Sequence, residues 1–322
     1  MLHTRICDLL AIEHPIISAP MTGRATAELV AAVSAAGGFG LIGGSTGGPE
    51  WLREQIRMVR ERTDRPFGVG FISSAPGLQA LVQVALEERV AAISHSFADP
   101  TPYVQAAHAV GVKVLAQVQT VAGAVAAARA GVDVITAQGT EAGGHTGYNG
   151  TLPFVPAVID VAGGIPVVAA GGIADGRGLA AVLMLGAEGA WIGTRFLASR
   201  EAGGAAWAKT RVVQAGADDT ILTQAYDLAQ NAPFPADVGG RVLRNAFTAR
   251  WHGLDDEVVA RQQELEAQVL AAEAADDARN APVYAGNDVG LISSIEPAAK
   301  IMHKLVLEAE QILRERPAKL LR

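Results

Sequence analysis

The sequence lacks most features that mark secreted, membrane-spanning or nucleic-acid-binding proteins. Cys7 is the one cysteine among 322 residues, so no disulfide can form within the chain, and an intracellular protein fits this composition. No apolar run approaches the ~18 residues of a membrane span, and charges at Arg5, Asp8 and Glu13 argue against a signal peptide. The net charge is −7 without a basic run, so nucleic acid is not an expected partner. We expect a cytoplasmic protein without a membrane segment.

Half of the residues are hydrophobic, which is enough for a large core. Short apolar runs alternate with alanine-rich helical patterns from residue 15 to residue 192. The predicted strands are 15–19, 39–42, 67–71, 90–94, 112–116, 132–136, 166–170 and 189–192. The predicted helices between them include 25–36, 50–62, 78–88, 101–110, 121–130 and 179–185. Because parallel neighbours need a crossover connection, this order predicts an α/β fold, a (β/α)8 TIM barrel.

The pattern changes after Ser199. Residues 204–215 and 254–275 read as helices, the connector 226–251 holds aromatic residues and prolines, and we predict no strand in this part. A loop at 283–290 and an amphipathic helix at 296–316 follow. We therefore expect a barrel formed by residues 1–200 with 290–322, and a small helical second domain, 201–289, that could roof the barrel mouth.

Active sites of TIM barrels lie where the strands end, so glycines at the last two strand ends are informative. Gly171 and Gly172 follow the seventh predicted strand, and Gly193 and Thr194 follow the eighth. Loops in these positions commonly bind phosphate through backbone N–H groups. The alternative is that the glycines only allow tight turns between strand and helix.

The loop 138–147 (QGTEAGGHTG) follows the sixth predicted strand and carries one Gln, one Glu and one His among its glycines. Its glycines permit close approach to a ligand, and His145 can exchange a proton near neutral pH. The alternative is a tight turn in which His145 only caps a neighbour. His95, at the fourth strand end, either lines the same pocket or is a structural histidine.

Other chemistries find less support in the sequence. Residues 38–43 match G-x-G-x-x-G, but these glycines precede and run through a strand instead of following it. Residues 43–47 match the G-x-S-x-G elbow around Ser45, which keeps a serine hydrolase as a distant alternative. No histidine has metal-ligand spacing, so no metal is predicted. Strand ends without lysine or paired carboxylates argue against Schiff-base aldolases and glycosidases, whereas a bound flavin could supply the chemistry.

Several segments together resemble the nitronate monooxygenase family, also known as 2-nitropropane dioxygenase-like proteins. They are 14–17 (HPII), 19–21 (APM), 64–69 (DRPFGV), 138–145 (QGTEAGGH), 169–176 (AAGGIADG) and 186–196 (GAEGAWIGTRF). The resemblance covers most of residues 5–200 and, weakly, 283–292. The wider superfamily includes FMN-dependent enoyl-ACP reductases and NAD(P)H:quinone reductases. The resemblance implies a TIM barrel that holds FMN non-covalently and a small helical second domain.

The resemblance also implies roles for individual residues. His145 occupies the position of the catalytic histidine, which takes a proton α to a nitro group or donates a hydrogen bond to the nitronate. Met21 and Gln117 would lie beside the isoalloxazine, and Gly171 with Gly172 would hold the phosphate. The complete set of implied FMN contacts is Pro20, Met21, Gly70, Gln117, Gln138, Gly143, Gly144, Ala170, Gly171, Gly172, Trp191, Ile192, Gly193 and Thr194. At Gly70 the family often has asparagine, so this chain lacks one side-chain amide near the flavin.

The implied reaction is FMN-dependent oxidation of alkyl nitronates by O2 to a carbonyl compound and nitrite. An alternative is an FMN reductase that uses NAD(P)H to reduce an enoyl-ACP or a quinone. A third possibility, from another class, is a carrier or sensor that binds FMN without turnover. The expected partners are the small-molecule substrate and O2, and the chain is expected to be a monomer or a homodimer.

Overall fold

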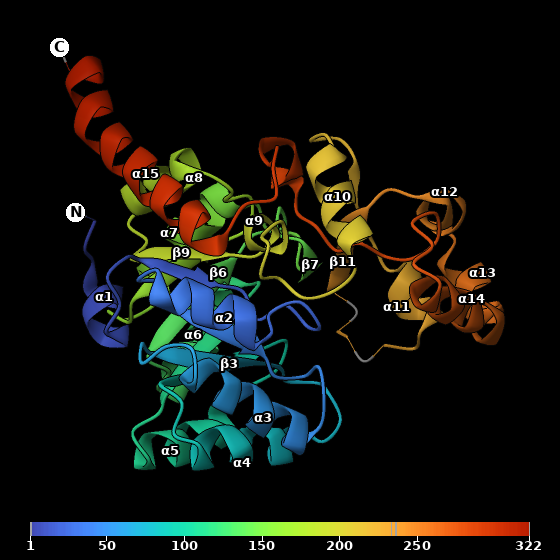
Figure 1. Ribbon diagram of the computed structural model, residues 1–322, viewed down its shortest axis with the longest axis horizontal. Helices are drawn as coiled ribbons and strands as arrows, with labels where there is room; N and C mark the ends of the chain where they lie inside the picture. Colours follow the sequence, from blue (N-terminus) through green and yellow to red (C-terminus); the bar gives the residue numbers. More distant parts are fainter. Residues whose placement is uncertain (1, 233, 236, 322) are drawn as a thin grey trace.

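The computed structural model describes residues 2–232, 234–235 and 237–321, and its main body is a barrel of eight parallel strands (Figure 1). The strands are β1 (Ile16–Ser18), β2 (Gly40–Gly43), β3 (Phe67–Ile72), β4 (Ala92–Ser96), β5 (Lys113–Val118), β6 (Val134–Gln138), β8 (Val167–Ala170) and β9 (Gly189–Ile192). Their order is β1-β9-β8-β6-β5-β4-β3-β2, and a parallel bridge between Ile17 and Phe39 joins β1 to β2. The predicted TIM barrel is confirmed, and each predicted strand overlaps one of these eight.

Helices cover the outside of the barrel because each connection between parallel strands must cross back. They are α2 (Ala27–Ala35), α3 (Pro49–Arg60), α4 (Leu78–Glu87), α5 (Thr101–Ala109), α6 (Val121–Ala130), α7 (Thr151–Val161), α8 (Gly176–Met184), the short α9 (Thr194–Leu197) and the closing α15 (Ala298–Leu320). The sequence pattern did not predict α7, which contains Pro156. Helix α15 packs against α8 and α2 and so completes the outer layer.

Alternate residues of each strand face two different cores. In β9, Ala190 and Ile192 belong to the outer core beneath the helices, whereas Trp191 belongs to the inner core of the barrel. The N-terminal helix α1 (Arg5–Leu10) adds Ile6, Cys7 and Leu10 to that inner core. It lies at the end of the barrel opposite the second lobe in Figure 1, so it plugs the bottom and the mouth opens toward the lobe.

The elements between α9 and α15 form a second lobe at the other end of the barrel (Figure 1). It contains α10 (Ala206–Gln214), α11 (Ala225–Ala229), α12 (Ala246–Trp251), α13 (Asp255–Ala260), α14 (Gln262–Ala274) and the 3-10 turn η1 (Asn287–Leu291). The predicted helix 254–275 is therefore two helices, which meet at Arg261.

The prediction that this part has no strand was wrong. Strands β10 (Thr220–Thr223) and β11 (Gly239–Leu243) pair antiparallel, and β11 pairs on its other edge with β7 (Gly144–Thr146). β7 belongs to the glycine-rich loop that follows β6, so the sheet joins that loop to the lobe. These strands are short, β7 and β11 contain glycine, and β7 is distant in sequence from its partner β11, so local periodicity could not reveal them.

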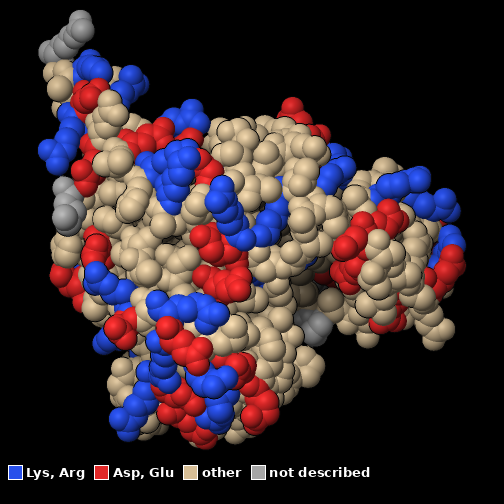
Figure 2. Space-filling view, in the orientation of Figure 1, with Lys and Arg blue, Asp and Glu red and all other residues tan. Residues whose placement is uncertain are grey.

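The surface carries interspersed charges of both signs, most densely over α3 and α4 in Figure 2. Arg53 and Arg60 of α3 form ion pairs there with Glu87 and Glu88. Exposed ion pairs of this kind contribute little stability. Positive and negative side chains are mixed on the surface in this view, so no large area carries charge of a single sign. Within the described residues, no helix combines the length and the apolar character that crossing a bilayer requires.

Candidate active site

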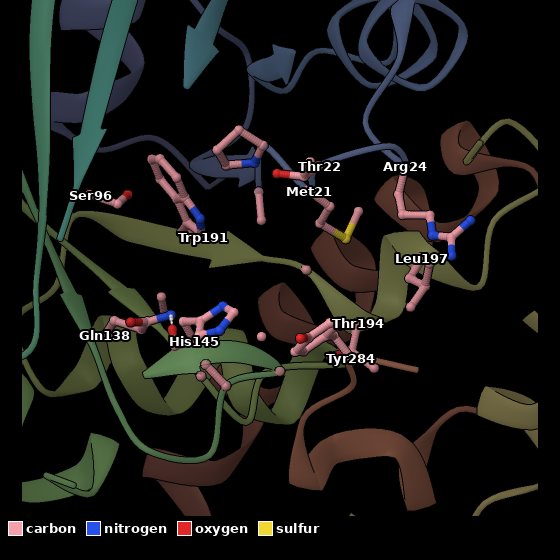
Figure 3. A pocket seen from close by; sticks show the side chains of 18 of the residues that line it. Met21, Thr22, Arg24, Ser96, Gln138, His145, Trp191, Thr194, Leu197 and Tyr284 are labelled. Atoms are coloured by element: carbon pink, nitrogen blue, oxygen red, sulfur yellow. Dashed lines mark hydrogen bonds between the residues drawn. The ribbon is translucent and has the colours of Figure 1, made fainter. Parts of the chain in front are cut away.

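A cavity of about 460 Å³ opens at the carboxyl ends of the barrel strands, which is the usual place for a TIM-barrel active site and a usual ligand-pocket size. Figure 3 shows Gln138, His145, Trp191 and Met21 around it. Fourteen of the fifteen residues proposed from the sequence line this cavity: Pro20, Met21, Gly70, Gln117, Gln138, Gly143, Gly144, His145, Ala170, Gly171, Gly172, Trp191, Gly193 and Thr194. The ends of six barrel strands and the loops after them thus converge on one pocket.

The exception is Ile192, which does not line the cavity. Its side chain is 1% exposed and packs in the outer core beneath the helices, because it alternates with the inward-facing Trp191. Only its backbone remains available to a ligand. The strand period of two decides which of these neighbours faces the pocket.

Gly70 lies where β3 approaches the loop after β1. A Cβ atom at this position would lie 2.3 Å from Cγ of Pro20, so any side chain here would collide with the proline ring. The asparagine common at this position in the family would therefore require Pro20 to move. Pro20 takes the space that such a side chain would occupy in the cavity wall.

Glycines leave one side of the cavity free of side chains. Gly171 and Gly172 have φ values of 103° and 75°, which side-chain-bearing residues rarely adopt. Gly143 approaches the chain opposite so closely that its Cβ would lie 2.6 Å from the backbone nitrogen of Gly286. Gly193 caps α9 and places Thr194 at that helix's first position. The result is a backbone-lined cradle suited to an anionic group such as phosphate.

His145 lies on β7 and is held by a carboxylate from the second lobe. Its Nε2 lies 2.7 Å from Oδ1 of Asp227 in α11, and the two side chains are 13% and 11% exposed. A neutral imidazole that donates from Nε2 to this carboxylate keeps Nδ1 as its proton acceptor. The carboxylate also stabilises the imidazolium that forms when the ring takes up a proton. The pair has the geometry of an oriented general base.

Aromatic side chains surround this histidine. The Phe234 ring stacks on the imidazole with centroids 3.4 Å apart, and Tyr284 and Phe97 lie at 5.4 and 6.2 Å. Phe97 has a φ of 67°, an uncommon value for a bulky residue and one that often marks functional sites. These rings fix the plane of the imidazole and keep the wall around it apolar.

Hydrogen bonds hold the glycine-rich loop in place behind His145. Gln138 accepts from Gln119 at 2.9 Å and donates to the carbonyl oxygen of His145 at 3.1 Å. The Glu141 carboxylate accepts from the backbone N–H and the hydroxyl of Thr151. The buried Arg241 of β11 donates from Nε to the carbonyl oxygen of Thr140 at 2.8 Å. Despite its glycines, the loop is thus tied to the segment after β5, to α7 and to the second lobe.

Asp288 is an acidic residue in the wall of the cavity near Thr194. Burial raises the pKa of Asp288 to about 6, although a hydrogen bond from Thr194 and the charge of Arg195 oppose this shift. Its Oδ1 atom is buried without a hydrogen-bond partner in the described part of the chain. This carboxyl can therefore exchange a proton in the physiological range beside the glycine cradle.

The remaining candidates from the sequence do not reach the cavity. His95 is 1% exposed, stacks on Tyr103 and shares a 2.9 Å hydrogen bond between its Nδ1 and Oγ of Ser73, so it is a structural histidine. Burial lowers the pKa of His95 to about 4.

Ser45 accepts a hydrogen bond from the backbone of Ile72 and does not line the cavity. Among the described residues no three His, Cys, Asp or Glu side chains gather as metal ligands do.

The sequence did not identify several residues that complete the site. Asp227, Phe234 and Tyr284 lie close to His145 in space but 82 or more residues beyond it in the chain. The connector 226–251 includes Asp227 and Phe234, but its aromatic residues and prolines did not single out either residue, and Tyr284 lies outside it. Other cavity residues that were not predicted include Thr22, Arg24, Ser96, Phe97, Glu273 and Asp288.

Comparisons with known proteins agree with this geometry. The family model described as "Nitronate monooxygenase" matches residues 3–80 and 72–308 of the chain. A probable nitronate monooxygenase of Staphylococcus saprophyticus is 33% identical over 304 residues, covering 80% of this chain and 83% of that protein. The structure of FabK from Thermotoga maritima superposes with a TM-score of 0.91 at 36% identity, covering 99% of this chain and 100% of that one.

A further relative carries a different name. A (3aS,4S,5R,7aS)-5-hydroxy-7a-methyl-1-oxo-octahydro-1H-indene-4-carboxyl-CoA dehydrogenase of Mycobacterium tuberculosis is 38% identical over 228 residues. The match covers 70% of this chain but only 64% of that relative, which is less than two thirds of its length. Relatives of this chain thus include proteins with dehydrogenase and monooxygenase names.

Proposed function

The chain belongs to the nitronate monooxygenase family, and we propose that it is an FMN-dependent oxidoreductase that oxidises nitroalkanes and their nitronates with O2 to a carbonyl compound and nitrite. The observation that carries the proposal is the pair of His145 and Asp227 in the wall of the cavity, with 2.7 Å between Nε2 and Oδ1. Such a pair can remove a proton from carbon next to an electron-withdrawing group. Family membership by itself supports only an oxidoreductase.

The residues of the cavity fit a flavin mononucleotide. The cradle formed by Gly171, Gly172 and Thr194 would hold the phosphate, since it offers backbone groups and no bulky side chain. Met21 and Trp191 would contact the apolar rings, and Gln117 and Gln138 would offer amide groups to the polar edge. When bound, FMN would accept electrons from the substrate and pass them to O2, which no side chain here can do.

The chain's own contribution is to bind, orient and deprotonate. His145 would take the α-proton of a neutral nitroalkane, and Asp227 would hold the ring and stabilise the imidazolium. Phe97, Phe234 and Tyr284 would exclude water from the reacting carbon and keep the local dielectric constant low. A preformed nitronate has already lost this proton, so it should depend less on His145.

The proposal is tested by anaerobic absorbance spectroscopy of the FMN-loaded protein. We expect propyl nitronate alone to bleach the flavin absorbance near its visible maximum, and O2 to restore it with release of nitrite. NADH and NADPH, added separately, should act slowly or not at all. Protein that binds no FMN, or that retains an oxidised spectrum with nitronate, would refute the proposal.

A second candidate function is favoured by the match to a carboxyl-CoA dehydrogenase. Carbon next to a thioester carbonyl is also acidic, so the same histidine could serve in α,β-dehydrogenation of an acyl thioester or, in reverse, in reduction of an enoyl thioester. In the reductive direction, a quinone could take the place of the enoyl thioester as electron acceptor. Rapid bleaching of the flavin absorbance by NADPH, with no change in that absorbance on addition of propyl nitronate, would favour this reductase function.

A further inference from the structure

Tyr284 is a cavity residue to which the sequence assigns no role. Its partly buried side chain lines the pocket with His145, and the centroids of the two rings are 5.4 Å apart at an angle of 37°. Figure 3 shows both side chains beside the same space. A small ligand that touches the imidazole can therefore also reach the phenol.

The register of β11 explains why the two side chains share a face. His145 pairs with Gly240, and Tyr284 forms an antiparallel bridge with Val242, two residues further along the same strand. β10 pairs with residues 240–243 along one edge of β11, so β7 and the segment around Tyr284 lie one after the other along the opposite edge. Positions opposite residues two apart point to the same side of a sheet. The pairing thus puts both side chains on the same face of the sheet, and both line the cavity.

The ring of Tyr284 is held, but its hydroxyl is free. A Cβ at Gly240 would lie 3.1 Å from Cε1 of Tyr284, so the glycine makes room for the ring. The backbone is fixed on both sides, because Leu243 donates to the carbonyl oxygen of Val283 at 2.8 Å and Ala285 donates to that of Arg241 at 3.3 Å. Within the described residues, no hydrogen bond involves the hydroxyl, and it is not among the buried unpartnered atoms. It remains available to a ligand.

The protonation state of this phenol is well defined. Burial raises the pKa of Tyr284 above its usual value, and the negative charge of Asp227 adds to the shift. The hydroxyl therefore keeps its proton at neutral pH, and it acts as a donor. By contrast, the Tyr226 hydroxyl is already used, since it donates to the carbonyl oxygen of Asn280 at 2.8 Å.

We propose that the Tyr284 hydroxyl is a further catalytic group, which donates a hydrogen bond to the substrate oxygen that becomes negative while His145 removes the α-proton. The C–H bond breaks, the imidazole takes the proton, and the electron pair moves onto the nitro group, whose oxygens share the charge. Tyr284 keeps its own proton. A fixed donor aimed at developing charge lowers the barrier because it needs no reorganisation. This inference rests on the proposed nitroalkane chemistry.

The test compares Tyr284→Phe with wild type, both loaded with FMN, on nitroethane and on preformed ethyl nitronate. On nitroethane we expect kcat to fall about 10²-fold with little change in KM, because the charge forms only in the transition state. On ethyl nitronate the charge is present from the start, so KM should rise while kcat changes little. Tyr148→Phe, at an exposed position outside the cavity, serves as the control for loss of a hydroxyl and should match wild type.

The outcomes separate this inference from the proposed function. Wild type without turnover on either substrate would overturn both. An active wild type with Tyr284→Phe within about threefold of its kcat on nitroethane would overturn the inference alone. A parallel fall of kcat on both substrates would also overturn it, since that result indicates a disturbed site. Equal FMN content and melting temperature of the two proteins establish that the folded holoenzymes are being compared.

Discussion

Asp227 places a carboxylate oxygen 2.7 Å from Nε2 of His145, although 82 residues separate them in the chain. The histidine comes from the loop after β6 and the aspartate from α11 of the second lobe. The reactive pair is therefore assembled only when the lobe docks on the barrel. The short sheet of β7, β11 and β10 makes that connection by backbone hydrogen bonds.

Asp227→Asn tests whether the carboxylate orients the histidine. The amide has nearly the same shape, but it lacks the charge that stabilises the imidazolium and can present its NH2 group to the ring. We expect kcat on nitroethane to fall about 10²- to 10⁴-fold while FMN remains bound, as seen for the aspartate of the serine-protease triad. Steady-state nitrite release measures the effect. Asp256→Asn, an exposed residue of the same lobe, is the matched control. Equal rates for the two variants would remove Asp227 from the mechanism.

Gly70→Ala tests the close contact between β3 and the loop after β1. The added methyl group would lie 2.3 Å from Cγ of Pro20. The proline ring is bonded to its own backbone nitrogen, so it cannot rotate to another position to relieve this contact. We expect a loss of about 1–3 kcal/mol in unfolding free energy, together with weaker FMN binding as Pro20 and Met21 are displaced. Gly48→Ala has open space at its Cβ and should be nearly neutral in both. Urea unfolding and flavin fluorescence provide the two readouts, and unchanged values for Gly70→Ala would contradict the contact.

Gly172→Ala tests the proposed phosphate cradle. Gly172 has a φ of 75°, so an alanine strains the loop and places a methyl group beside the anion. We expect the affinity for FMN to fall by about tenfold or more, whereas riboflavin, which has no phosphate, should lose much less. Gly163→Ala introduces similar backbone strain at a φ of 62° far from the cavity, and it should leave both affinities unchanged. An equal loss for FMN and riboflavin would place the phosphate elsewhere.

His95 should make the protein sensitive to acid. Burial lowers its pKa from 6.5 to about 4, so between these values the unfolded chain binds more protons than the folded one. Stability is therefore full above about pH 6.5 and declines as pH falls toward 4, by up to about 3 kcal/mol from this residue. His95→Phe keeps a ring stacked on Tyr103 but cannot titrate. Urea unfolding at about pH 7 and pH 4.5 should show the smaller acid loss for the variant, and parallel losses would contradict the assignment.

The barrel was predictable because its signal is local. Most β/α units carry their own apolar run and helix pattern, and the crossover rule then leaves few architectures. Gly171, Gly172, Gly193 and Thr194 could be placed at the mouth for the same reason, since strand ends define that face. His145 followed from its position in the loop after the sixth barrel strand.

The second lobe was less predictable because its contacts are long-range. The segments 220–223 and 239–243 are too short to show a strand period, and they form strands only by pairing with each other and with β7. Asp227 and Tyr284 could not be assigned roles without that pairing. Ile192 was included with its neighbours, although the alternation along β9 turns its side chain to the outer core.

The most direct measurement of the central claim is the turnover of His145→Asn on two substrates that differ by one proton. With FMN bound, we expect kcat/KM on neutral nitroethane to fall about 10²- to 10⁴-fold, because the base is gone. On preformed ethyl nitronate the variant should retain most of the wild-type value, since no proton has to be removed. Equal activity of variant and wild type on nitroethane, or equal losses on both substrates, would contradict a role for His145 as the base.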